Sequence, residues 1–531
     1  MISRSRLERG VFAFFSVAAF SVLVVVPVVC VVFKAVDIEP KSASNVFLDA
    51  RQWGLLRNSL ILAVGTSAVA GLAGVMSAFA IANVSSSLRG VLLGLLAVPL
   101  LIPPHISAIA WVDLLGRNGI FVVQFTGLNT KALTWPGMFH MSGVVWSLGL
   151  ASYPIVMVAT LAALHRFDSR LLEAARMGGQ RWRAFSGVQL PLVLPGVIAG
   201  MLLVFVYTLV SFAVPSLLQV NTYPVEINAL SAVFDYTGAT LQALPLAVLC
   251  GLAGLVWILY VRPRHAWLTG HVRPANVVAD PVVRSVSTLV CLALIVVAVF
   301  LPLGVTLARA LPLRTFHDVW ATARHEMLTS LFVSMMSATL ATTLAFLMTT
   351  ALRRWTQGFS VALSALPLGI TGGAFGLGLI TLWNHRGPAG LVYDSLAVVI
   401  VACTARFFVF ALAGALSGAR RMDARLDEAA AVAGVTWIRR AGAIWLPLLS
   451  PHLAATWGLI FVLTMAEVDT SVLVCPPGQT TLAIRLFSLM HYGPDSYVAA
   501  LSLLTCVLVM TIAACVAFGY AKLRNWTHAG Y

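Results

Sequence analysis

The sequence predicts an all-α membrane protein of about twelve transmembrane helices in two homologous six-helix halves. Three observations predict it: 60% of the residues are hydrophobic and only 10% are charged, apolar runs of spanning length recur, and one long motif occurs twice. A soluble domain typically carries about 25% charged residues. With so few charges the chain cannot cover a water-facing surface, so lipid must contact most of it.

The apolar runs define the expected spans. A bilayer core needs about 20 apolar residues per helix, and only a helix satisfies the backbone polar groups within such a segment. The first run exceeds the roughly 7–15 residues of a signal-peptide core, so we expect it to be retained. The runs lie at 11–33, 58–83, 91–115, 141–164, 192–214, 240–261, 285–308, 328–352, 358–383, 393–417, 448–468 and 496–521.

The basic residues predict the orientation. The net charge is +15, but Lys and Arg lie in short loops between the runs rather than on one face, so we expect no nucleic-acid partner. If the amino terminus is cytoplasmic, 22 of the 34 Lys and Arg residues are cytoplasmic too. The positive-inside bias therefore predicts that both termini are cytoplasmic.

One polar stretch divides the chain near its middle. Residues 262–284 are basic and contain three prolines, which is typical of a linker. We therefore expect a first half over 1–261 and a second half over 285–531, each with six spans.

A duplicated loop is the most informative feature. Each copy has Glu-Ala-Ala, then a glycine, then a Leu-Pro step that enters the next apolar run. This order predicts a short helix, a glycine turn and a second short helix. The defining residues are Glu173, Ala174, Ala175, Gly179 and Pro191 in the first copy, and Glu428, Ala429, Ala430, Gly434 and Pro447 in the second.

Both copies resemble the EAA-x3-G-x9-I-x-LP motif of the permeases of bacterial binding-protein-dependent ATP-binding-cassette importers. The second copy, 428–447, fits throughout, whereas the first, 173–191, is one residue shorter and has Val188 where Ile is usual. The resemblance implies a type I importer permease fold in the bacterial inner membrane. It also implies that both loops are coupling helices that dock on ATPase subunits.

The resemblance implies partners as well. Two loops imply two ATP-binding-cassette ATPase subunits, and the family implies a periplasmic solute-binding protein and contact with membrane lipid. The chain itself is expected to be no enzyme and to bind no cofactor. None of its four lysines follows a glycine, so it has no phosphate loop. ATP and Mg²⁺ are therefore expected in the partner subunits.

Charged residues within the runs are candidates for the translocation path, because burying them in a membrane is costly. They are Arg406 in the tenth run, Glu467 and Asp469 at the outer end of the eleventh, and Asp113 near the outer end of the third. The alternative is that Arg406 forms a structural ion pair and that the carboxylates reach interfacial water.

Helix-breaking residues mark two further runs. The third contains VPLLIPPHIS and the ninth contains five glycines from Gly369 to Gly378, so we expect bent or broken helices and close packing there. His105 follows these prolines and is a further path candidate. We expect it to be a packed histidine, and we expect no metal site.

The substrate is less tightly specified. Fused two-half permeases of this length resemble those for ferric iron, thiamine and 2-aminoethylphosphonate. The segments PLLIPPHISAIAWVDLLGRNG and AEVDTSVLVCPPGQTTLAIRLFSLMHYG resemble the ferric-iron branch most. A twelve-helix secondary transporter driven by an ion gradient is the alternative class, although it would not need paired coupling loops.

Overall fold

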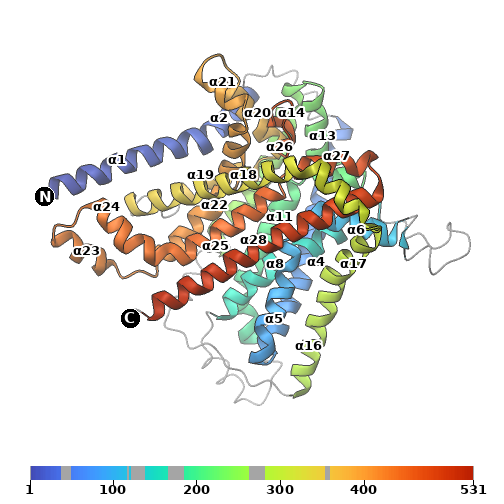
Figure 1. The fold of residues 1–531 in the computed structure, drawn as a ribbon, viewed down its shortest axis with the longest axis horizontal. Coiled ribbons are helices and arrows are strands. Elements are labelled where there is room, and N and C mark those ends of the chain that lie inside the picture. The colour runs from blue at the N-terminus through green and yellow to red at the C-terminus, as the bar shows by residue number, and fades with distance from the viewer. Residues whose placement is uncertain are drawn as a thin grey trace, which may run out of the picture.

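The computed structural model describes residues 2–36, 49–116, 119–120, 138–165, 185–261, 281–352 and 359–529. Every regular element over these residues is a helix. Figure 1 shows the elongated helices gathered into two groups that meet in the middle of the molecule. The all-α class predicted from the sequence is confirmed.

The first half supplies six predicted spans and two short helices between the fifth and the sixth. Its helices are α1 (Ile2–Phe20), η1 (Ser21–Val25), α2 (Val26–Val36), α4 (Ala50–Asn83), α5 (Ser86–Ala97), η2 (Val98–Leu100), α6 (Pro104–Leu115), α8 (Met141–His165), η3 (Phe185–Gln189), α11 (Leu190–Leu209), α12 (Ala213–Leu217), α13 (Tyr223–Ala232), α14 (Tyr236–Val256) and η4 (Trp257–Val261).

The second half repeats this order. Its helices are α16 (Pro281–Ile295), η5 (Val296–Phe300), α17 (Leu301–Arg309), α18 (Arg314–Ala351), α19 (Phe359–Gly369), α20 (Gly372–Trp383), α21 (Pro388–Tyr393), α22 (Ala397–Ala419), α23 (Ala424–Val432), α24 (Trp437–Arg440), η6 (Ala441–Trp445), α25 (Leu446–Met465), α26 (Ser471–Val474), α27 (Leu482–Tyr492) and α28 (Asp495–Ala529).

The predicted spans correspond to these helices. Within the described residues ten helices are long and apolar enough to cross a membrane, or up to twelve if each of two bent pairs is one span. The bent pairs are the third and ninth runs, where the chain turns by 90° before Pro104 and by 108° before Gly372. The prolines and glycines thus break both helices, as predicted. The predicted linker lies outside the described residues as far as 280, and its last four residues begin α16.

The short helices after the fifth and eleventh spans were not predicted, because neither contains a run of spanning length. Both are fixed in the same way. The Tyr223 N–H at the start of α13 donates to Ser59 Oγ of α4 at 3.0 Å, and the Leu482 N–H at the start of α27 donates to Ser330 Oγ of α18 at 2.6 Å. A serine on each half's second span therefore satisfies the first N–H of a short helix that would otherwise have no partner.

Each half has a core of three equivalent helices. In the first half α4, α8 and α11 pack against one another, and in the second half α18, α22 and α25 do so. The first spans are exchanged between the halves. α1 and α2 pack on α18 and α20 of the second half, whereas α16 packs on α4 and α5 of the first. The two sequence halves are therefore interlocked.

Close approach of α4 to α8 depends on glycine. A Cβ at Gly74 would lie 2.8 Å from the Tyr153 carbonyl oxygen and 2.9 Å from the Met157 nitrogen, whereas a Cβ at Gly54 of the same helix meets nothing within 4 Å. We predict that Gly74→Ala lowers the free energy of unfolding by about 1–3 kcal/mol. Gly54→Ala should instead stabilise α4 by roughly 0.5–1 kcal/mol. Thermal unfolding of both variants in lipid nanodiscs checks this, and equal melting temperatures would contradict it.

Candidate functional site

The second copy of the duplicated motif forms a helix, a turn and a second helix. α23 begins after Asp423, whose carboxylate accepts a hydrogen bond from the Arg425 N–H at 3.0 Å. The chain reverses at Gly434, whose φ of +79° lies in the left-handed region that favours glycine. α24 and the π turn η6 then lead into α25, in which Pro447 is the second residue. This is the shape that the motif predicts.

The first copy is described only at its end. Glu173, Ala174, Ala175 and Gly179 lie outside the described residues. Pro191 is the second residue of α11, which follows the π turn η3 as α25 follows η6. Both copies therefore enter the next span through a π turn and a Leu-Pro step.

The tip of the second loop presents apolar and acidic side chains to its surroundings. Glu428 and Ala429 are exposed and Ala430 is half-buried. Val432 is 89% exposed, and Ile438 is exposed as well. Exposed apolar residues grouped on a loop are typical of a protein interface. In Figure 1 this loop lies at the end of the molecule that also carries both chain termini.

An internal brace holds the two short helices of this loop together. The Arg440 Nη1 lies 2.9 Å from Asp427 Oδ1, and the Trp445 Nε1–H donates to the same oxygen at 3.0 Å. The Arg440 side chain is buried, so its pairing with Asp427 is shielded from solvent. Sequence reasoning missed this brace because it counted Arg440 only as one more cytoplasmic charge.

Three of the path candidates form one buried cluster. The Arg406 Nη1 lies 3.0 Å from Glu467 Oε1, and its Nη2 lies 3.6 Å from Asp469 Oδ2. The Arg406 and Glu467 side chains are 5% and 8% exposed. Glu467 Oε1 also accepts the Thr470 N–H at 2.8 Å. The ion pair that the sequence left as the alternative for Arg406 is thus present, and it includes both carboxylates.

The cluster reaches across the two halves. The Phe212 N–H, in the break between α11 and α12, donates to Asp469 Oδ2 at 3.4 Å. A Cβ at Gly372, where α20 begins, would lie 2.5 Å from the Asp469 Cβ. The cluster therefore lies where the breaks after α11 and α25 meet the break in the ninth span. It carries one positive and two negative formal charges.

The other two path candidates lie elsewhere in the structure. Asp113 of α6 lies 3.7 Å from Arg309 Nε at the end of α17. His105, near the start of the same helix, is 2% exposed. Its burial agrees with a packed histidine. Among the described residues no three His, Cys, Asp or Glu side chains are grouped as a metal site would need.

Comparisons with known proteins identify the family. Residues 70–267 match the family described as binding-protein-dependent transport system inner membrane component. A probable molybdenum ABC transporter permease protein of Haloferax volcanii is 30% identical over 217 residues, which cover 40% of this chain and 75% of that protein. The chain belongs to this family. With its series of apolar helices, this inner membrane component is a multi-pass protein of the inner membrane.

Two further relatives are similar to this inner membrane component over stretches of different length. The Haemophilus influenzae molybdenum transport system permease protein ModB is 32% identical over 128 residues, 23% of this chain. The chain spans about half of that relative, 53% of its length. The Salmonella typhi putative 2-aminoethylphosphonate transport system permease protein PhnV is 26% identical over 249 residues, 44% of this chain and 94% of the relative. The match covers nearly all of this relative and slightly less than half of this chain, which agrees with a chain of two fused halves.

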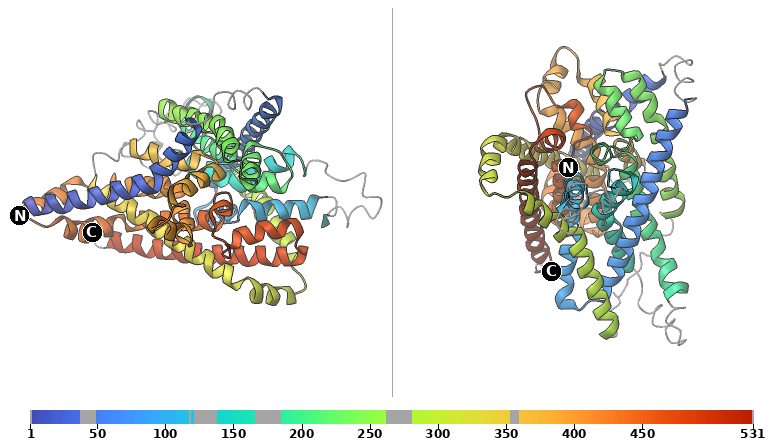
Figure 2. Two further views of the ribbon diagram at one scale, coloured as in Figure 1. Left: turned by 90° about the horizontal axis from the view of Figure 1, so that it is seen from above. Right: turned by 90° about the vertical axis from the view of Figure 1, so that its right-hand side faces the viewer.

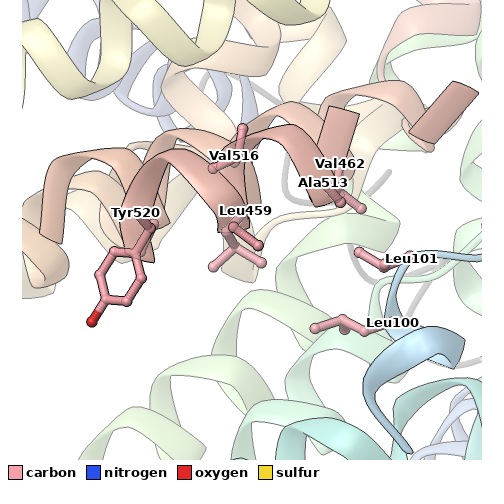
Figure 3. A pocket seen from close by; sticks show the side chains of 10 residues that line it. Leu100, Leu101, Leu459, Val462, Ala513, Val516 and Tyr520 are labelled. Atoms are coloured by element: carbon pink, nitrogen blue, oxygen red, sulfur yellow. The ribbon is translucent and has the colours of Figure 1, made fainter. Parts of the chain in front are cut away.

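The two halves of this membrane component also border an apolar cavity of about 280 Å³. Leu100 and Leu101 of the first half face Leu459, Val462 and other residues of α25 and α28 (Figure 3). Its lining is almost entirely hydrocarbon, so it offers a charged solute no partner. The charged cluster and the pair of Asp113 with Arg309 are polar contacts between the halves, whereas this cavity is apolar.

Proposed function

We propose that this chain is the permease of an ATP-binding-cassette importer, with both permease halves in one polypeptide. Two ATPase subunits would dock on the duplicated loops, and a periplasmic binding protein would deliver solute to the opposite face. The observation that carries the proposal is the shape of the second loop. Its short helix α23 presents the exposed Glu428 and Val432, and it ends just before Gly434, whose backbone has a left-handed conformation.

In the proposed mechanism, the loops transmit the movement of the ATPases to the membrane-spanning helices. Closure of the ATPases on ATP would move α23 and α24, and the brace between Asp427 and Arg440 would pass that movement to η6 and α25. α25 ends close to the charged cluster, where Asp469 accepts a hydrogen bond from Phe212 of the other half. Movement of the loops would therefore shift the contact between the halves and open the path.

Transport by the reconstituted chain tests this function. The purified chain is placed in liposomes with its candidate ATPases and binding protein, and solute uptake is measured with and without ATP. We expect uptake only when ATP, the ATPases and the binding protein are all present. Uptake by the chain alone, driven by an ion gradient, would overturn the proposal and support a secondary transporter.

For the solute, the relatives favour a small oxyanion over ferric iron. The names of the three relatives above refer to molybdenum and 2-aminoethylphosphonate. 2-Aminoethylphosphonate is also one of the alternatives that the sequence resemblance implies, whereas ferric iron rests on that resemblance alone. Competition for binding-protein-dependent uptake among molybdate, 2-aminoethylphosphonate, thiamine and ferric iron distinguishes them. Selective uptake of iron would overturn the oxyanion assignment.

A further inference from the structure

The amino-terminal helix of the first half packs on the coupling loop of the second. The Phe12 ring of α1 lies against the Trp437 indole, with ring centroids 5.0 Å apart and an interplanar angle of 31°. Trp437 is the first residue of α24 and is buried with Ala441 and Ala351. Figure 2 shows α1 extending along the second half to the end where α23 lies.

Two polar contacts fix α1 beside this aromatic pair. The Arg9 Nε–H donates to the carbonyl of Ala351 at 2.9 Å, at the last residue of α18, where helix carbonyls lack partners within the helix. The Arg440 Nη2 donates to Ser5 Oγ at 3.3 Å, while its Nη1 binds Asp427 at 2.9 Å. One buried guanidinium therefore joins α1 to both short helices of the loop.

Over the part of the chain that the structure describes, the first span of the other half lacks an aromatic ring at the position of Phe12. Both first spans carry a five-residue π turn, Ser21–Val25 in one and Val296–Phe300 in the other. Counting nine residues back from each π turn leads to Phe12 and to Ser287. A serine has no aromatic face, so α16 carries no ring at the position that corresponds to Phe12.

The two copies of the motif also differ in sequence at the residues that form the brace in the second copy. The residue before Glu-Ala-Ala is Asp427 in the second copy and Leu172 in the first. The residue before Leu-Pro is Trp445 in the second copy and Gln189 in the first. The first copy therefore has no carboxylate and no indole at these two positions.

We infer that α1 is a positioning element for the second coupling loop: it holds α23 and α24 in the orientation that receives an ATPase. The first half thus controls the docking surface of the second. A loop that is held in this orientation should bind an ATPase at a lower entropic cost than the same loop without the contacts from α1. This inference rests on the proposed function for its consequence, although not for the contacts themselves.

Three variants of the full-length chain test the inference in lipid nanodiscs. Phe12→Ala removes the ring, Phe12→Tyr keeps it, and Phe14→Ala removes a ring of the same helix that is 70% exposed. Hydrogen exchange of residues 424–436 is measured without any ATPase. We expect about threefold to tenfold faster exchange in Phe12→Ala alone, as an aromatic pair is lost. Ser5→Ala provides a second, smaller perturbation if Phe12→Ala does not fold.

ATPase affinity and turnover are then measured on the same samples. A positioning role predicts that Phe12→Ala weakens ATPase binding while the ATP hydrolysis rate at saturation stays unchanged, and that Phe12→Tyr restores binding. Equal loop exchange in Phe12→Ala and Phe14→Ala would overturn the inference. If the unaltered chain binds no ATPase, the proposed function fails instead, and the exchange measurement still decides whether α1 holds the loop.

Discussion

Arg406→Met is expected to lower the free energy of unfolding by about 3–5 kcal/mol, because it leaves the buried Glu467 and the half-buried Asp469 without their cation. Glu467 and Asp469 both lie within 3.6 Å of the guanidinium. Without it, their like charges repel each other where little solvent screens them. Thermal unfolding in nanodiscs, followed by tryptophan fluorescence, measures the loss.

A control variant separates the effect of losing the buried cation from the effect of losing a long side chain. Arg421→Met removes an exposed arginine just beyond the same helix, so it should leave the unfolding temperature almost unchanged. Neutralising the partners as well, in Arg406→Met with Glu467→Gln and Asp469→Asn, should recover most of the lost stability. If Arg406→Met melts like Arg421→Met, the cluster does not stabilise the contact between the halves.

The spans could be predicted because apolar runs report directly on burial in lipid. Their breaks could be predicted too, since the prolines before His105 and the glycines around Gly372 obstruct or loosen a helix locally. The exchange of the first spans could not be predicted. The exchange depends on which half Phe20 and Cys291 pack against. An apolar residue in the sequence indicates that it is buried, but it does not indicate which half buries it.

The candidate site was predicted in part for the same reason. The motif predicted the helix, turn and helix around Gly434, because local turn chemistry determines that shape. Arg406, Glu467 and Asp469 could each be named as a candidate because a charge within a span is costly. Their grouping could not be predicted, because only the fold brings together Arg406 and Glu467, which are 61 positions apart. The brace between Asp427 and Arg440 and the contact from Phe12 depend on tertiary packing, so no periodic pattern revealed them.

A substitution at the turn of the second coupling loop is also expected to have a large effect. Gly434→Val should reduce ATPase association about tenfold, since a β-branched residue in the left-handed region costs roughly 1–2 kcal/mol and shifts the loop to other conformations. Gly434→Asn should retain most of the association, because asparagine tolerates that region. Co-purification and titration of the ATPase with each variant provide the measurement.

Gly478 supplies a matched control for this substitution. It has the same φ of +79°, a Cβ there meets nothing within 4 Å, and it lies between α26 and α27 rather than in the loop. Gly478→Val therefore introduces a similar strain without touching α23 or α24, and ATPase association should persist. Loss of association in both variants would point to general destabilisation. Loss in Gly434→Val alone would tie ATPase docking to the geometry of this one turn, since only there does the strained residue orient α23.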